Sequence, residues 1–504
     1  MQSRHWTLLQ IVFASALANS PLVAATCESL ASLKLPDTTV TSAQTVAAGP
    51  FTPPQGNATV VPNLPSFCRV TATLTPSSDS AIQIEVWLPS TGWNGNFQAV
   101  DNGGWGGSVN YAEMGTALAR GYATSSTDTG HTGGRASFAM GHQEKLIDFG
   151  FRSVHEMTLK AKAIIAAFYE SAPKHSFFAG CSSGGRQGLM EAQRFPEDYD
   201  GIVVGAPTNN WTNMMFGRMW VAHATLTDPA SHIPASKYPV IHSAVLNACD
   251  TLDGVKDGVL EDPTRCHFDP QVLQCKDADE PSCLTKQQVE AARKIYTPAK
   301  NPRTGQEIFP AMERGSELVW ATLAGGPAPI RLAEDYFRFV VFEDPQWDFK
   351  TLNFDGDLTN AQTRDGGTLT AASPDLKPFF SRGGKLIHYH GWTDQQVMPR
   401  NSINYYNSVA RAVGGIAKAA DSYRLFMAPG MNHCGGGDGP NTFDALAALE
   451  QWVERGKAPD SIIASHSTDG KVDRSRPLCP YPQVAKYKGT GSTDNAANFA
   501  CVAP

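Results

Sequence analysis

A run of small residues at 180–185 is the feature that most constrains the fold of this chain. It reads Gly-Cys-Ser-Ser-Gly-Gly and contains the pattern Gly-x-Ser-x-Gly around Ser182. The apolar stretch 176–179 before it is typical of a strand, and 187–192 after it is typical of a helix. A serine on a sharp turn between strand and helix needs small neighbours, and the turn lifts its hydroxyl above the sheet. The pattern therefore predicts a nucleophile elbow with Ser182 as the nucleophile.

Short glycine and serine motifs also arise by chance in loops, so a catalytic Ser182 needs partners elsewhere in the chain. A serine nucleophile requires a base and an acid that orients the base, and after an elbow of this kind the order is serine, acid, histidine. Asp394 follows the strand-like run 385–390, and His433 follows another such run, 423–427. Either residue alone could belong to an ordinary loop. Their order and their places after strands favour a triad of Ser182, Asp394 and His433.

Two other histidine patterns have plainer interpretations. His388 and His390 alternate on one predicted strand and so share a face, with a metal pair as the alternative. Asp128 and His131 could form a rival acid–base pair. Because that pair precedes the predicted nucleophile in the chain, we interpret it as a structural loop.

The oxyanion of an acyl-transfer intermediate needs two hydrogen-bond donors. One is expected to be the backbone N–H of Ser183, directly after the predicted nucleophile. The other is expected from the glycine-rich run 102–107, which follows a segment that begins in strand-like alternation at 82–88. Glycine lets the backbone approach a substrate closely, and Gly103 and Gly104 are both candidates. A plain glycine turn is the alternative.

The ten cysteines suggest disulfides, because they are even in number and follow a predicted export signal. Their spacing suggests four local pairs, which are Cys27–Cys68, Cys249–Cys266, Cys275–Cys283 and Cys479–Cys501. Cys181 and Cys434 remain, and they adjoin Ser182 and His433. One bond between them would hold the nucleophile beside its base, although spacing does not prove the connectivity. A zinc site is the alternative, but no Cys-x-x-Cys spacing occurs.

Residues 1–25 are typical of a secretory signal. Arg4 supplies a positive start, 8–18 is an apolar core, and 23–25 offers small residues for cleavage. A membrane anchor is the alternative, but the apolar stretch is short for a bilayer. The formal net charge of −7 argues against a nucleic-acid partner. We predict a secreted or periplasmic protein with no membrane or nucleic-acid partner.

Alternating strand and helix patterns predict an α/β fold with a parallel sheet covered on both faces. The segment 151–170 has an amphipathic helical pattern, and 201–207 is typical of a buried strand. The alternation stops at 209–377, which holds four of the cysteines, many prolines and acidic loops. We therefore predict an α/β-hydrolase fold, with 26–208 and 378–504 as the catalytic domain and 209–377 as an inserted lid.

The predicted lid contains a second candidate site at 250–259. Three carboxylates, those of Asp250, Asp253 and Asp257, lie close together beside glycines that permit tight turns. The main-chain carbonyls of Val255 and Val259 could complete a shell of hard oxygen ligands, which is what Ca²⁺ requires. The spacing is not that of an EF-hand. We predict a structural Ca²⁺ site away from Ser182, with a solvated acidic loop as the alternative.

Taken together, these motifs resemble the tannase and feruloyl esterase family, which includes mono(2-hydroxyethyl) terephthalate hydrolase. The resemblance rests on Gly-Cys-Ser-x-Gly-Gly at 180–185, Asp394, His-Cys at 433–434 and Asp-Gly-Val-Lys-Asp-Gly at 253–258. It covers nearly the whole chain after the predicted signal. It implies a serine esterase that works through an acyl-enzyme, carries a calcium-binding lid and forms the five disulfides suggested above.

The resemblance also implies a substrate class, the small esters of aromatic acids. Feruloyl and other hydroxycinnamoyl esters are expected above all, free or attached to plant polysaccharide or tannin. Galloyl esters and terephthalate monoesters are the alternatives, because the lid residues match no single subfamily. The rival from another class is a noncatalytic, calcium-stabilised binding protein on the same fold. A triad in the correct order weighs against that rival.

Overall fold

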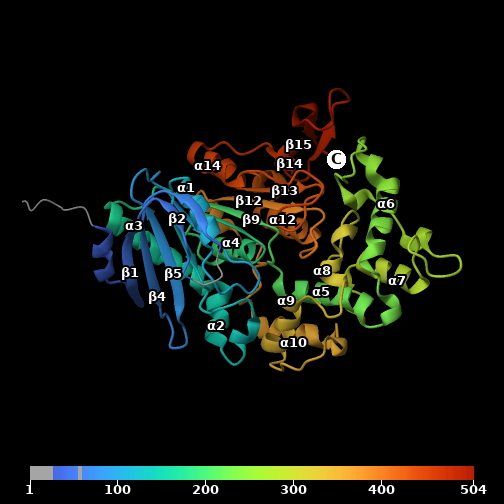
Figure 1. The fold of residues 1–504 in the computed structure, drawn as a ribbon, viewed down its shortest axis with the longest axis horizontal. Helices are drawn as coiled ribbons and strands as arrows, with labels where there is room; N and C mark the ends of the chain where they lie inside the picture. Colours follow the sequence, from blue (N-terminus) through green and yellow to red (C-terminus); the bar gives the residue numbers. More distant parts are fainter. Residues whose placement is uncertain (1–25, 55–58) are drawn as a thin grey trace, which may run out of the picture.

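The computed structural model describes residues 26–54 and 59–504, so the predicted secretory signal lies outside the described residues. A nine-stranded sheet forms the centre of the molecule (Figure 1). Its strands are β1 (Thr38–Val46), β4 (Phe67–Leu74), β5 (Ile82–Pro89), β6 (Phe97–Val100), β7 (Ala123–Thr127), β8 (Ser176–Cys181), β9 (Gly201–Gly205), β12 (Lys385–Gly391) and β13 (Tyr423–Ala428). Across the sheet they follow the order β1-β4-β5-β7-β6-β8-β9-β12-β13.

The sheet is mixed, which corrects the prediction of a parallel sheet. From β7 to β13 in this order, neighbouring strands run parallel. The pairs β1–β4, β4–β5 and β5–β7 are antiparallel. The alternation of strands and helices predicts only the parallel part, because antiparallel neighbours can be joined by short turns without a crossover helix.

Helices cover both faces of the sheet. One face carries α1 (Tyr111–Ala119) and α14 (Ala445–Arg455), and the other carries α3 (Ser153–Tyr169), α4 (Ser183–Arg194) and α12 (Arg400–Val413). Phe177 packs with the first group and Phe178 with the second, because successive strand residues point to opposite faces. The amphipathic helix predicted at 151–170 is confirmed as α3. Three shorter helices are α2 (Gln143–Ile147), α11 (Lys377–Ser381) and α13 (Ile416–Ala419).

Between β9 and β12 the chain leaves the sheet and folds into a helical segment, which lies mainly to the right and below in Figure 1. Its elements are α5 (Trp211–Leu226), α6 (Tyr238–Cys249), α7 (Lys286–Ile295), β10 (Ala299–Lys300), β11 (Glu307–Phe309), α8 (Ala321–Ala324), α9 (Arg331–Asp335) and α10 (Gly356–Asp365). Trp211 and Trp320 are fully buried in its core, which also takes in Trp105 from the sheet domain. Arg135 binds Asp335 through two hydrogen bonds of 2.6 and 2.7 Å, which ties this lid to the sheet domain.

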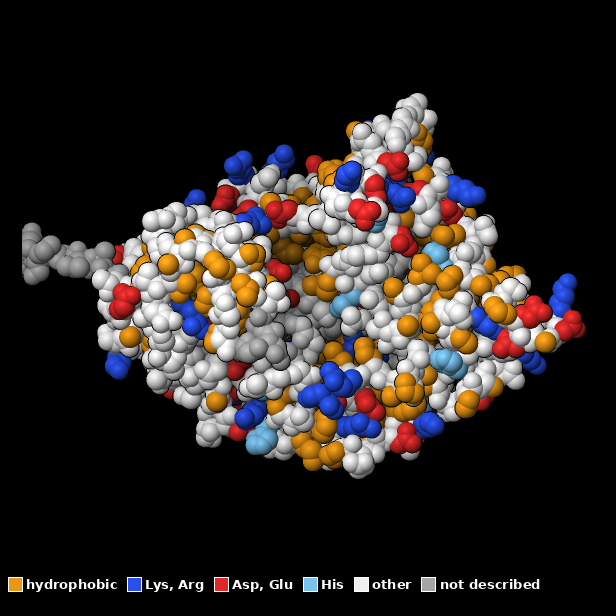
Figure 2. All heavy atoms as spheres, viewed as in Figure 1, with side chains coloured by type: hydrophobic (Ala, Val, Ile, Leu, Met, Phe, Trp, Pro, Cys, Tyr) orange, Lys and Arg blue, Asp and Glu red, His pale blue; other side chains and the backbone are white. Residues whose placement is uncertain are grey.

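The chain ends in two hairpins beside the lid, β14 (Ile462–Thr468) with β15 (Lys471–Leu478) and β16 (Val484–Tyr487) with β17 (Phe499–Val502). A small hairpin of β2 (Gly49–Phe51) and β3 (Val61–Leu64) lies near α1. No helix among the described residues is long and apolar enough to span a bilayer. Figure 2 shows that the viewed face is hollowed near its middle, with hydrophobic side chains in the hollow.

All five disulfides suggested by the sequence are present. They are Cys27–Cys68, Cys181–Cys434, Cys249–Cys266, Cys275–Cys283 and Cys479–Cys501. Four of them close loops of 8 to 41 residues, whereas Cys181–Cys434 spans 253 residues. This long-range bond joins the last residue of β8 to the loop after β13, on either side of β9 and β12 in the sheet.

Candidate active site

Ser182 occupies the turn between β8 and α4. Its backbone has φ 62° and ψ −120°, which a residue with a β-carbon adopts only where its surroundings hold it. Its N–H donates to the carbonyl of Gly205 at 2.9 Å, and its own carbonyl accepts from the N–H groups of Arg186 and Thr208 at 3.0 and 3.1 Å. The side chain is partly exposed. The predicted elbow is therefore present in the structure.

Asp101 lies directly beneath this elbow and explains two of its glycines. A β-carbon at Gly184 would lie 2.0 Å from Asp101 Oδ2, and one at Gly180 would lie 2.7 Å from Asp101 Cβ. Asp101 Oδ2 accepts from the N–H of Cys181 at 2.7 Å, and Oδ1 accepts from Asn110 Nδ2 at 3.2 Å. Burial raises the pKa of the Asp101 carboxyl to about 6, although the Cys181 hydrogen bond opposes the rise. Sequence reasoning missed Asp101, whose one signal is its place before the glycine-rich loop.

The predicted acid and base are in contact. Asp394 Oδ2 lies 2.7 Å from His433 Nδ1, and both side chains are buried. Asp394 Oδ1 accepts from the N–H groups of Gln396 and Val397 at 2.7 and 2.9 Å, so the carboxylate cannot rotate freely. Burial alone would raise the pKa of Asp394. The charge of His433 and hydrogen bonds from His433 and His390 outweigh burial and hold that pKa below its ordinary value.

The Cys181–Cys434 disulfide brings the third predicted residue to this pair. Its Cα atoms are 6.0 Å apart, and each cysteine is the chain neighbour of Ser182 or His433. His433 is also held by its N–H, which donates to Gln395 Oε1 at 3.1 Å. Within the described part of the chain no hydrogen bond leaves the Ser182 hydroxyl. In ligand-free active sites this contact often tightens only when substrate binds.

The glycine-rich loop lies against the elbow. Ser183 Oγ donates to the carbonyl of Gly104 at 2.8 Å, and Asn102 anchors the loop by donating to Ser108 and Thr127 carbonyls at 2.8 and 2.7 Å. In the parts of the chain that the structure describes, no acceptor binds the N–H of Ser183, Gly103 or Gly104. These three N–H groups are therefore free to bind a ligand, and their role as oxyanion donors stays a prediction.

The surroundings distinguish the two candidate glycines. A β-carbon at Gly103 would have nothing within 4 Å, whereas Gly104 has φ +58° and its β-carbon would lie 3.4 Å from Leu332 Cδ1. Leu332 belongs to α9 of the lid, and its carbonyl accepts from Trp105 Nε1 at 3.0 Å. The lid therefore covers the oxyanion loop with an apolar side chain. Sequence reasoning did not identify Leu332.

Asp128 and His131, which we interpreted as a structural loop, are held by hydrogen bonds in the interior. His131 Nε2 lies 2.9 Å from the carbonyl of Trp105, and Asp128 Oδ1 accepts from the N–H groups of Gln83 and Gly130 at 2.9 and 2.8 Å. His390 contacts the predicted acid, which its alternation with His388 on one strand does not predict. Its Nε2 lies 3.0 Å from Asp394 Oδ2.

The predicted calcium loop surrounds a small cavity of about 10 Å³, which is room for one water or small ion. Four of the five predicted ligands line it, namely Asp253, Val255, Asp257 and Val259, together with Glu261. Asp250 instead accepts from the N–H groups of Asp257 and Gly258 at 3.3 and 3.1 Å. Carboxylate and carbonyl oxygens suit a hard cation such as Ca²⁺, so this donor set fits the ion. Arg476 lines the same cavity and pairs with Asp257, so it would share that carboxylate with the ion. Glu261 lies just beyond the predicted motif and was missed for that reason.

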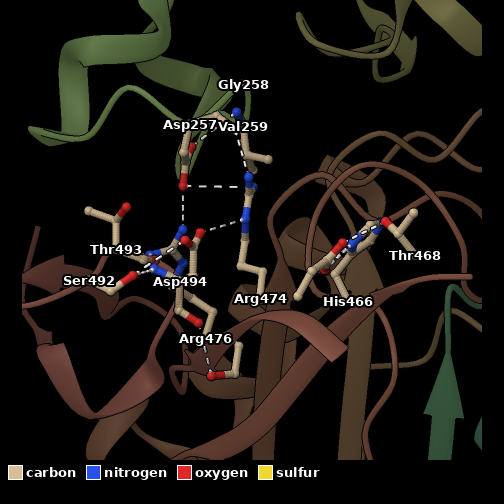
Figure 3. A network of polar contacts seen from close by, with 12 residues as sticks. Asp257, Gly258, Val259, His466, Thr468, Arg474, Arg476, Ser492, Thr493 and Asp494 are labelled. Carbon is tan, nitrogen blue, oxygen red and sulfur yellow. Dashed lines mark hydrogen bonds and ion pairs between the residues drawn. The ribbon is translucent and has the colours of Figure 1, made fainter. Parts of the chain in front are cut away.

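Figure 3 shows how the C-terminal hairpin contacts this loop. Asp257 reaches down from the lid to Arg474 and Arg476 of β15. Arg476 pairs with Asp257 Oδ2, and Arg474 Nη2 donates to the Asp257 carbonyl at 3.1 Å. Arg476 also packs on the Phe499 ring, with its guanidinium carbon 3.9 Å from the ring centroid. The two arginines partly neutralise the acidic loop and join it to the C-terminal hairpins.

A second group of possible metal ligands lies between α3 and α4. Ligand atoms of His155, Glu191 and Asp198 are within 4.8 Å of one another. His155 Nδ1 lies 2.6 Å from Asp198 Oδ2, and Lys162 donates to the Asp198 carbonyl. Burial and the adjacent Asp198 raise the pKa of Glu191 well above its ordinary value, which favours a neutral carboxyl. This group is therefore interpreted as internal packing of the two helices.

Comparison with known proteins identifies the family. A family model described as tannase and feruloyl esterase matches residues 68–502. The chain belongs to the tannase and feruloyl esterase family. It is 40% identical to an uncharacterized esterase of Xanthomonas campestris, with 97% of this chain and 93% of that protein covered. It is 35% identical to a probable feruloyl esterase B-1 of Aspergillus oryzae, with 87% and 84% covered.

Solved structures of this family share the whole fold. Feruloyl esterase B from Aspergillus oryzae has a TM-score of 0.89 at 32% identity, and covers 94% of this chain and 99% of its own. Tannin acyl hydrolase from Aspergillus niger has a TM-score of 0.79 at 21% identity, with 94% and 93% covered, and shows the fold alone. The predicted α/β-hydrolase fold is confirmed. As a member of the feruloyl esterase and tannase family, the protein is a carboxylic ester hydrolase.

Proposed function

We propose that this esterase hydrolyses esters of aromatic acids, feruloyl and other hydroxycinnamoyl esters above all, through an acyl-enzyme on Ser182. The observation that carries the proposal is the Cys181–Cys434 disulfide, which holds His433 beside the elbow while His433 Nδ1 lies 2.7 Å from Asp394 Oδ2. The three proposed catalytic residues come from three separate segments of the chain, and these two contacts support their joint action.

The reaction follows from these positions. Ser182 Oγ attacks the ester carbonyl carbon as its proton passes to His433 Nε2, and Asp394 stabilises the resulting imidazolium. The tetrahedral intermediate expels the alcohol, which takes the proton from His433. Water then attacks the acyl-enzyme with His433 again as base, and the aromatic acid leaves as Ser182 recovers its proton. Asp394 remains ionised throughout, in agreement with its lowered pKa.

The oxyanion of each intermediate is proposed to bind the N–H of Ser183 and one N–H of the glycine-rich loop. The Ser183 hydroxyl supports this assignment, because its 2.8 Å bond to the Gly104 carbonyl fixes the loop against the elbow. Gly103 is the preferred second donor, since the space where its β-carbon would lie is open, whereas a β-carbon at Gly104 would contact Leu332. Donors fixed before the reaction stabilise the developing charge without reorganisation.

The substrate class rests on the relatives and on the lid. Relatives at 33–35% identity are named feruloyl esterase B, which favours hydroxycinnamoyl esters. Leu332 gives the site an apolar wall, which suits an aromatic ring. Galloyl esters and terephthalate monoesters are the alternative substrates. Membership of an esterase family argues against the noncatalytic binding protein considered from the sequence.

We also propose that the loop 250–259 holds one structural Ca²⁺. Asp253, Asp257 and the carbonyls of Val255 and Val259 would bind it at the small cavity, with Asp250 as the remaining predicted ligand and Glu261 beside them. The ion would hold the loop in shape and take no part in the ester chemistry. Five disulfides and the predicted signal support a secreted or periplasmic location.

A product assay on methyl ferulate, methyl gallate and a terephthalate monoester, run in parallel, tests the substrate class. Feruloyl ester hydrolysis is expected to have the largest kcat/KM. Ser182→Ala is expected to lower kcat by about 10³-fold or more without changing the fold, because the nucleophile is lost. Near wild-type turnover in a folded Ser182→Ala protein would refute the mechanism. A higher kcat/KM on gallate or terephthalate would refute the substrate assignment alone.

A further inference from the structure

Behind the catalytic acid, four buried side chains form a continuous hydrogen-bonded chain. His390 Nε2 lies 3.0 Å from Asp394 Oδ2 and 2.9 Å from the Val397 carbonyl. His390 Nδ1 lies 2.6 Å from Ser402 Oγ, which lies 2.8 Å from His388 Nε2. His388 Nδ1 lies 2.7 Å from the Tyr423 hydroxyl. His388, His390, Ser402 and Tyr423 are all 0% exposed, so water does not supply alternative partners.

For a neutral His390, the partners determine the direction of every bond in this chain. A carboxylate and a main-chain carbonyl only accept, so His390 Nε2 must carry a hydrogen. In a neutral imidazole the other nitrogen then accepts, and the Ser402 hydroxyl must donate to His390 Nδ1. Ser402 Oγ in turn accepts from His388 Nε2–H. His388 Nδ1 is left to accept from the Tyr423 hydroxyl, which completes a chain of donors that all point toward Asp394.

Burial supports the neutral form of His388. Desolvation lowers the pKa of His388 well below its ordinary value. The residues of the hydrogen-bonded chain belong to three packed elements. His388 and His390 are on β12, Tyr423 is on β13, and Ser402 is on α12, which packs against both strands. The chain therefore joins two strands and a helix to the carboxylate of Asp394.

We propose that Ser402 and His388 are positioning residues, which fix the ring of His390 so that its Nε2–H points at Asp394 Oδ2 and thereby orient Asp394 for its contact with His433. The proposal rests on the triad of the proposed function. Asp394 Oδ2 is shared by His390 and His433, while Oδ1 is fixed by two backbone N–H groups. The hydrogen bond from His390 to Oδ2 therefore affects how strongly Asp394 interacts with His433.

Loss of the Ser402 hydroxyl would release this arrangement. His390 Nδ1 would be left as a buried acceptor without a donor, and the ring would be free to turn so that its Nε2–H moves away from Asp394 Oδ2. The carboxylate would lose a donor, and it would hold the His433 imidazolium more tightly. Both the alignment of His433 and the acid limb of the pH profile would change. A displacement of about 1 Å in such a group can cost about 10²-fold in rate.

The other charged and titratable groups beside this chain have partners of their own. Tyr405 on α12 donates to the Ser373 carbonyl at 3.1 Å. Arg218 on α5 acts on Asp394 through its charge, and its Nε donates to the Gln396 carbonyl at 3.0 Å. Tyr406 on α12 packs edge-on against Tyr423, with ring centroids 4.9 Å apart. Neither Arg218 nor Tyr406 takes part in a hydrogen bond of the chain described above. Variants of Ser402 therefore test the chain without removing a charge.

The test compares Ser402→Val with Ser402→Thr. Valine and threonine have the same shape, so the packing change is shared and the difference isolates the hydroxyl. Ser402→Val is expected to have a kcat about 10-fold or more below that of Ser402→Thr, with KM values within about threefold. The apparent pKa of the acid limb is expected to be higher in Ser402→Val than in Ser402→Thr. Equal kcat values, or an acid limb that does not rise, would overturn the proposal.

Two further variants keep the test decisive. If Ser402→Val does not fold, Tyr423→Phe replaces it, because this change removes only the hydroxyl that starts the chain. It is expected to lower kcat and raise the acid limb relative to wild type, and an unchanged profile would overturn the proposal. Ser182→Ala distinguishes a failure of the positioning role from a failure of the proposed function. If Ser182→Ala is inactive while the hydroxyl variants match wild type, the triad stands and the positioning role fails. If Ser182→Ala stays active, the proposed function itself fails.

Discussion

The substitution Asp101→Asn tests whether the elbow is built on a carboxylate that is costly to ionise. Asp101 Oδ2 accepts from the Cys181 N–H, and Gly180 and Gly184 leave the space that this side chain occupies. Asparagine has nearly the same shape and keeps an oxygen to accept that bond. Its NH2 group then faces Asn110 Nδ2, so the hydrogen bond from Asn110 is lost at every pH. Only the loss of ionisation depends on pH, so the pH dependence of stability isolates it.

The size of the effect follows from the pKa of Asp101. Burial raises this pKa from 3.8 to about 6. A carboxyl with a raised folded-state pKa contributes stability below its unfolded pKa and loses it as pH rises through the folded pKa. The full shift corresponds to an upper limit of about 3 kcal/mol at about 1.36 kcal/mol per pKa unit. Because the residue is partly exposed, solvent screening reduces this, and we expect about 1–2 kcal/mol.

The assay is urea unfolding of wild type and Asp101→Asn at pH 4.5 and pH 8. The free energy of unfolding of Asp101→Asn, relative to wild type, is expected to rise by about 1–2 kcal/mol between these pH values. The control is Asp460→Asn, whose carboxylate is 96% exposed and stays in water on folding, so no such rise is expected. A relative stability of Asp101→Asn that is the same at both pH values would refute the reasoning. So would an equal rise in the control.

Three further predictions follow from the site. Replacing Cys181 and Cys434 together by alanine should lower the free energy of unfolding by up to about 5 kcal/mol, because the bond spans 253 residues. It should also lower kcat further than removal of any other disulfide does, and full activity would contradict the proposed role of this bond in holding His433 beside Ser182. Exhaustive chelation should lower the melting temperature more than it lowers the initial activity, since a structural ion stabilises only the folded state. An unchanged melting curve, together with no calcium in metal analysis, would show that the loop 250–259 is an acidic loop without an ion. Gly184→Ala should destabilise the protein, because the added β-carbon would lie 2.0 Å from Asp101 Oδ2. Gly103→Ala should fold normally and lower only turnover, because its β-carbon would have nothing within 4 Å. Equal losses of stability in the two variants would refute this prediction.

The sequence by itself determines the local chemistry of this protein. The elbow is readable because a strained turn between strand and helix admits few residue types, and Ser182 has the φ of 62° that such a turn requires. Helix α3 is readable because its apolar residues recur at the helical period. The order of Ser182, Asp394 and His433, each after a strand, indicates the triad because the ends of parallel strands meet at one edge of a sheet.

Only the tertiary structure places residues whose importance comes from distant neighbours. Asp101 matters because it lies under Gly184, and Leu332 matters because the lid lays it over Gly104. His390 looks like an ordinary strand residue until β12, β13 and α12 are packed together and its Nε2 lies 3.0 Å from Asp394. Hydrogen bonds and steric contacts between segments depend on strand order and packing. Neither residue type nor spacing along the chain encodes these two properties in a readable form.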